Sequence, residues 1–231
     1  MATARSNAAR TNQSGSVFVY VLVAVALFGA LMFAFSRSAR EGGSNMSDRQ
    51  TQLAAADVTG FAQQLERAVS RIMQHDMSEN QLSFDNSHVA GYANAGDCGA
   101  DACKVFKPNG GGADWENPDP QAMDSAGDWV ITGGDAVPGV GDDATADLLL
   151  LLPGVKKELC VKINDNLKVT NPSGMPPVDA DGIDQTLFTG AFPSPTTAVI
   201  ADAAQLNGVH AGCFKDNASG KYVFFDVLIE R

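Results

Sequence analysis

An uncharged apolar segment near the N-terminus constrains the fold of this chain more than any other feature. Residues 16–35 read SVFVYVLVAVALFGALMFAF and contain no Asp, Glu, Lys or Arg. At a rise of about 1.5 Å per residue, a helix of this length matches the roughly 30 Å hydrocarbon core of a bilayer. The sequence therefore predicts one membrane-spanning helix over residues 16–35.

The charges that flank this segment do not orient it. Two arginines precede the apolar run and two follow it closely, so the positive-inside rule is balanced. A cleaved secretory signal would carry its small-residue cleavage site after an apolar core of about 7–15 residues. Here the small residues Ser14 and Gly15 come before the apolar run, which indicates a different kind of leader.

The leader, residues 1–15, resembles the class III signal of type IV prepilins and type II secretion pseudopilins. It is short and basic, ends in Gly15 and runs directly into an apolar helix. The resemblance implies that a prepilin peptidase cuts after Gly15 and leaves Ser16 as the mature N-terminal residue, which the N-terminal methylation of this class would modify. Gly29 also stands where many family members carry Gly in a similar apolar context.

The sequence departs from the family pattern at Tyr20, which stands where most members have Glu. In the family this Glu lies within the bilayer and is thought to neutralise the terminal amine of a neighbouring subunit, because unpaired charges there are costly. Some minor subunits at the filament tip also lack it, so the resemblance implies a minor or divergent subunit. The alternative is an uncleaved signal anchor in which Gly15 is incidental.

Residues 36–76 are expected to form a linker followed by an amphipathic helix. Gly42 and Gly43 each cost about 1 kcal/mol inside a helix relative to Ala, so we expect a break there, with the next helix starting near Ser47. Beyond it, apolar residues recur at intervals of three and four, at Val58, Phe61, Leu65, Val69 and Ile72. This spacing predicts a helix with one apolar stripe, which needs a sheet to cover it.

The remaining residues, 77–231, are expected to form one exported globular head rich in loops. The patterns predict short strands over 128–132 and 147–152, the latter ended by Pro153 and Gly154, a helix over 155–167, and a terminal hairpin over 209–215 and 222–229. The predicted fold class is α+β: a long N-terminal helix, transmembrane in its first half and amphipathic in its second, packed on a small antiparallel sheet with long loops.

The four cysteines, Cys98, Cys103, Cys160 and Cys213, all follow the apolar segment, where an exported domain meets an oxidising compartment. An even number there favours disulfides over reduced core thiols, and the spacing does not suit zinc. Of three possible connectivities we predict Cys98 with Cys103, which closes a small loop, and Cys160 with Cys213, which joins the short helix to the terminal hairpin.

Asp179, Asp181 and Asp184 place three carboxylates around Gly182. Calcium prefers such hard oxygen ligands, although the segment lacks the spacing and the terminal Glu of an EF-hand loop. Some major pseudopilins bind calcium near their C-terminal ends, so a calcium site is one interpretation and a solvated acidic turn is the other. No other cofactor is expected.

Charge and residue types disfavour two classes of function, nucleic-acid binding and catalysis. The chain has 16 basic and 27 acidic residues, a net charge of −11, which disfavours binding to nucleic acid through phosphates. The histidines, His75, His88 and His210, occur singly and without a catalytic motif around them, so we expect no enzyme.

The sequence favours a structural subunit of a type IV pilus or a type II secretion pseudopilus-like filament. Such a subunit would be anchored in the bacterial inner membrane by one helix before assembly, with its C-terminal domain in the periplasm or in the extracellular filament. Its partners would be membrane lipid, other pilin-like subunits and a prepilin peptidase. The alternative is a membrane-anchored periplasmic binding domain that never polymerises; an exported enzyme ranks last.

Overall fold

The computed structural model describes residues 15–142, 145–194, 196 and 198–231, with the side chains of residues 19–29 and 48 onward within those ranges. The chain divides into two compact units, Met1–Arg49 and Gln50–Arg231. The predicted leader lies outside the described residues apart from Gly15, and the predicted membrane segment is described only in part.

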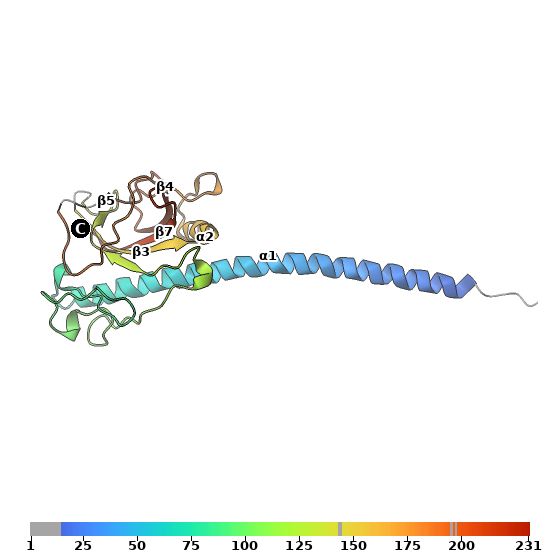
Figure 1. Ribbon diagram of the computed structural model, residues 1–231, viewed down its shortest axis with the longest axis horizontal. Helices are drawn as coiled ribbons and strands as arrows, with labels where there is room; N and C mark the ends of the chain where they lie inside the picture. Colours follow the sequence, from blue (N-terminus) through green and yellow to red (C-terminus); the bar gives the residue numbers. More distant parts are fainter. Residues whose placement is uncertain (1–14, 143–144, 195, 197) are drawn as a thin grey trace, which may run out of the picture. The chain divides into compact units, whose positions relative to one another are not determined.

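One helix, α1, extends over Gly15–Met73 and contributes to both units (Figure 1). In the first unit, large apolar side chains are more than half exposed at Val19, Tyr20, Val21, Leu22, Val23, Val25, Leu27 and Phe28. Among the residues described in full, no helical stretch combines the length and the apolar character that a bilayer crossing requires.

The expected break at Gly42 and Gly43 is absent, because α1 is helical through both residues. The predicted start of a second helix near Ser47 is therefore wrong, because Ser47 lies within α1. Two glycines destabilise a helix by only about 2 kcal/mol relative to Ala, and the preceding residues 39–41, Ala, Arg and Glu, are strong helix formers.

The head contains a five-stranded sheet in the order β1-β3-β7-β6-β4 and a separate two-stranded pair, β2-β5. The strands are β1 Val130–Thr132, β2 Asp135–Ala136, β3 Leu148–Val155, β4 Val178–Asp179, β5 Ala198–Val199, β6 Ala211–Asp216 and β7 Tyr222–Ile229. The predicted hairpin is confirmed as β6 and β7. The sheet is mixed and not purely antiparallel, because β4 pairs parallel with β6.

Strand β3 continues through Pro153 and Gly154, so the predicted end of this strand is wrong. Proline lacks a backbone N–H and is tolerated where a strand has no neighbour on that side. The adjacent strand β1 pairs only with residues 149–151 of β3, so Pro153 lies beyond the end of β1. The register with β7 shifts between Pro153 and Val155, where Gly154 adopts a φ of 88°.

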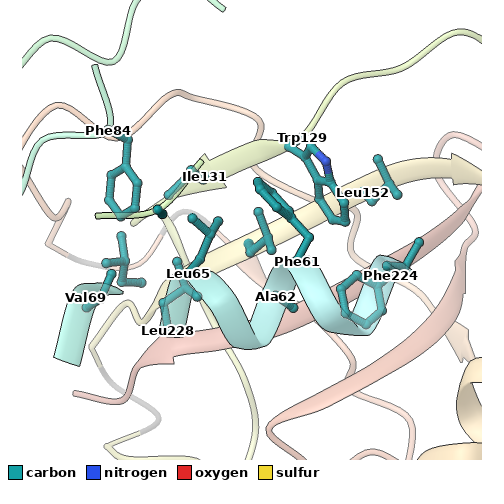
Figure 2. Packing of buried hydrophobic residues seen from close by; sticks show 14 of the residues in the cluster. Phe61, Ala62, Leu65, Val69, Phe84, Trp129, Ile131, Leu152, Phe224 and Leu228 are labelled. Carbon is teal, nitrogen blue, oxygen red and sulfur yellow. The ribbon is translucent and has the colours of Figure 1, made fainter. Parts of the chain in front are cut away.

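Residues 50–73 of α1 cover one face of the five-stranded sheet. Figure 2 shows Phe61, Leu65 and Val69 packed against Trp129, Ile131, Leu152, Phe224 and Leu228. All five residues of the predicted apolar stripe are at most 5% exposed, which confirms the amphipathic helix. The second helix, α2 (Lys157–Leu167), is also confirmed and buries Leu159 and Ile163 in the same core.

The opposite face of the sheet has its own apolar cluster, so the sheet is buried on both sides. Its members are Val137, Val140, Leu149, Leu151, Val169, Ile200, Ala201, Leu206, Phe214, Val223, Phe225 and Val227. Burial on both faces explains why β3 is a continuous apolar run instead of an alternating one. Single-turn 3₁₀ helices lie in the loops at Glu79–Gln81, Asp101–Cys103, Pro120–Ala122 and Pro172–Gly174.

Candidate functional site

The residues predicted for processing and assembly lie on the first unit of α1. Gly15 is the first residue of α1 in the described part of the chain, and the side chain of Ser16 lies outside that part. Tyr20 is 72% exposed, and a Cβ placed on Gly29 would meet no atom within 4 Å. Both positions therefore present open helix surface in this unit.

Both predicted disulfides form. Cys98 and Cys103 have Cα atoms 5.7 Å apart, and those of Cys160 and Cys213 are 5.3 Å apart, both within the range that disulfides need. The first bond closes a loop that follows α1. The second joins α2 to β6 inside the core, where Cys160 and Cys213 are completely buried.

The predicted calcium ligands do not converge as a group of three. Asp179 is buried at the end of β4, where its carboxylate accepts hydrogen bonds from the backbone N–H groups of Gly182 (3.2 Å) and Asp202 (3.4 Å). Asp181 is exposed and lines a surface pocket of about 520 Å³ together with Asp184 and Asp216. The structure thus joins two of the predicted residues with one that was not predicted.

Within the described part of the chain, no group of three or more His, Cys, Asp or Glu side chains has the arrangement of a metal site. The Asp184 carboxylate accepts a hydrogen bond from the backbone N–H of Thr186 at 2.8 Å, and that of Asp216 accepts from the N–H groups of Ala218 and Ser219. These bonds hold the turns at residues 184–186 and 216–219. Calcium binding at this pocket stays a prediction, which titration with the ion would test.

Asp135, on β2, is a buried carboxyl group that the sequence did not reveal. Its Oδ2 accepts a hydrogen bond from the backbone N–H of Asp184 at 2.8 Å, while its Oδ1 has no partner among the described residues. The pKa of Asp135 is raised to about 7, mainly by burial and also by the charges of Asp184 and Asp179, while the hydrogen bond from Asp184 lowers it.

Asp179 has a raised pKa for the same reason. Its pKa is raised to about 6: burial is the largest cause, the charges of Asp202 and Asp216 also raise the value, and the two backbone hydrogen bonds lower it. At neutral pH, protons therefore partly neutralise this acidic region of the head.

A second pocket, of about 390 Å³, lies on the loops between residues 85 and 115. His88 and Trp115 line it with their rings nearly parallel, at 9°, and with centroids 6.1 Å apart. The rest of the wall is mostly polar and includes Asp85, Lys107 and Asp114. Sites for small molecules are usually lined mainly by apolar and aromatic side chains, and in this pocket the His88 and Trp115 rings provide that kind of surface.

The other two histidines lie on different elements. His75 is exposed just after α1, and His210 pairs with Glu230 at 3.1 Å on the exposed ends of β6 and β7. The Trp115 pocket gave no sequence signal, because its walls come from separated loops. Comparison of the chain with protein-family models, curated proteins and solved structures found no match.

Proposed function

We propose that this chain is a structural subunit, minor or divergent, of a type IV pilus or type II secretion pseudopilus-like filament. The observation that carries the proposal is helix α1. Its residues 50–73 form one layer of an α+β head, and the same helix includes the apolar residues 19–28. This agrees with the family resemblance, in which one helix serves first as anchor and then as assembly element.

The first unit of α1 supports an anchor that is later buried in a filament. Large apolar side chains from Val19 to Phe28 are exposed around the helix, with no charge between residues 16 and 35. A helix that is apolar on all sides requires an apolar environment. Lipid would supply it before assembly, and the helices of neighbouring subunits would supply it afterwards.

The head supports a role outside the cytoplasm. All four cysteines form disulfides, and such bonds persist in oxidising compartments such as the periplasm. The proposed subunit needs no cofactor and performs no chemistry. Its function is mechanical: α1 holds the subunit in the filament, and the head lies at the filament surface.

Processing after Gly15 tests this proposal. The chain is expressed with and without a prepilin peptidase, extracted from membranes and analysed by intact mass and N-terminal sequencing. With the peptidase we expect a methylated Ser16 terminus, and without it the Met1 terminus. Gly15→Leu should block cleavage, whereas Gly29→Ala, a matched change inside the helix, should leave it intact. A Met1 terminus under both conditions contradicts the proposal.

The pocket at His88 and Trp115 favours a second candidate function, a membrane-anchored domain that binds a small polar ligand and does not polymerise. In that case the leader stays attached, and Trp115→Ala abolishes ligand binding without changing the oligomeric state. The processing experiment separates the two candidates, because only the filament subunit requires a Ser16 terminus.

A further inference from the structure

Asp226 is a buried acid in the middle of β7, whose other residues are all uncharged. It is 4% exposed. Side chains alternate along a strand, so Asp226 shares its face with Phe224 and Leu228, which pack against α1 (Figure 2). Its neighbours on the adjacent strands, Leu150 and Ala211, have apolar side chains that cannot form a hydrogen bond with the Asp226 carboxyl group.

Glu66 meets this carboxyl group from α1. The two side chains form a hydrogen bond, and Glu66 itself is half-buried beside the core residue Leu65. Two carboxyl groups can share a hydrogen bond only if one of them carries a proton, since an ionised carboxylate only accepts. The second oxygen of Asp226, Oδ1, has no partner among the described residues.

Among the described residues, no positive charge is found to act on the Asp226 carboxyl group. The charged group on α1 that affects the Asp226 carboxyl group is Glu66. The basic residues Arg67 and Arg71 line a surface pocket of about 370 Å³ together with Glu66. β3 and β6 place Leu150 and Ala211 beside Asp226, and α2 turns Leu159, Cys160 and Ile163 toward the same core. Burial, followed by the charge of Glu66, raises the pKa of Asp226 to about 8.

We infer that Asp226 and Glu66 form a proton-dependent latch that holds residues 50–73 of α1 on the sheet. With one proton shared, the pair carries a single charge and a hydrogen bond joins helix to strand. Without it, two negative charges face each other, one of them inside an apolar interface where an unpaired charge is costly. Loss of the proton therefore weakens the contact between α1 and β7.

The direction of the pH effect follows from the raised pKa. In the unfolded chain Asp has a pKa near 3.9, whereas in the folded head Asp226 titrates at about 8. The latch thus contributes its full stabilisation below about pH 4 and loses it as the pH rises to about 8. Within this window one bound proton changes the folding equilibrium by up to about tenfold per pH unit.

Hydrogen exchange of the full-length chain in detergent, followed by mass spectrometry from pH 5 to 8.5, tests the latch. The exchange of peptides within residues 50–73 is expressed as protection factors, which remove the intrinsic pH dependence of the exchange rate. We expect wild-type protection to fall with rising pH. Asp226→Asn keeps the shape without the charge, so its protection at pH 8.5 should exceed that of wild type by roughly tenfold or more, with a smaller difference at pH 5.

Two further variants make the result specific. Glu66→Gln removes the opposing charge from the accessible helix side and should also flatten the pH dependence, even if Asp226→Asn does not fold. Asp57→Asn, an exposed acid on the same helix, should leave the pH dependence as in wild type. The latch is refuted if Glu66→Gln and Asp57→Asn behave alike, or if Asp226→Asn changes protection equally at both pH values.

Discussion

Buried carboxyl groups are the residues whose behaviour depends most on the folded environment of the head. Asp135, Asp179 and Asp226 are each at most 4% exposed, and all three have raised pKa values. Raised values mean that the folded state binds protons more tightly than the unfolded chain does. The head should therefore be more stable in mild acid than at alkaline pH.

Asp135→Asn provides a test of this behaviour at one residue. The pKa of Asp135 is about 7 in the folded head, so its contribution to stability is full below about pH 4 and is lost as the pH rises through 7. Replacing it with neutral Asn should reduce the slope of unfolding free energy against pH by up to about 1.4 kcal/mol per unit between pH 4 and 7.

Urea unfolding of the full-length chain in detergent measures this slope. The chain has two tryptophans, Trp115 and Trp129, and both lie in the head, so tryptophan fluorescence reports on the head alone. Asp128→Asn is the matched control, because Asp128 is an exposed acid in the same head. Equal slopes for wild type and Asp135→Asn would rule out the assigned role of Asp135.

At the scale of elements, a covalent bond links α2 to β6, because the disulfide between Cys160 and Cys213 connects them within the core. The bond between Cys160 and Cys213 spans 53 residues of chain, whereas the bond between Cys98 and Cys103 spans 5. In the chain-entropy account, a longer closed loop gives greater stabilisation, about 4 kcal/mol for the first bond and about 2 kcal/mol for the second.

Paired alanine substitutions check this order. The double variant of Cys160 and Cys213 should lose more unfolding free energy than the double variant of Cys98 and Cys103, by about 2 kcal/mol or more, since it also leaves a void in the core. Urea unfolding under non-reducing conditions gives both values. A larger loss of unfolding free energy in the Cys98 and Cys103 variant would show that the short disulfide loop contributes more to stability than the disulfide between α2 and β6.

Local patterns made several elements predictable from the sequence. The spacing of Leu159 and Ile163 predicted α2, and two apolar runs around a turn predicted the β6–β7 hairpin. The disulfides followed from distance along the chain, because Cys98 and Cys103 are close enough to close a small loop. In each case the residues that determine the element are close in sequence or follow one regular apolar spacing.

Other features depend on residues far apart and were not predictable. The continuation of β3 past Pro153 depends on where β1 ends, and the β2–β5 pair joins residues about sixty positions apart. A single Asp in the apolar strand β7 was visible in the sequence, but its partner Glu66 belongs to a helix more than a hundred residues earlier. The candidate pockets likewise combine separate loops.

In the whole molecule, the two units of the proposed subunit have different tasks. The first carries exposed apolar side chains on α1, and the second buries the amphipathic part of α1 under a sheet. An apolar helix would provide anchoring and assembly, while the acidic, disulfide-bonded head would remain folded at the surface. The proposed function requires that α1 contact pilin-like subunits through its first unit.

Photo-cross-linking from Tyr20 tests that claim most directly. A benzophenone amino acid replaces Tyr20, which is exposed on α1, and the chain is irradiated in cells that contain a pilus or secretion assembly system. We expect protein adducts of the processed chain that contain a pilin-like subunit, and no such adducts from the same probe at Glu158 on α2. Processed chain that links only to lipid from Tyr20 would contradict it.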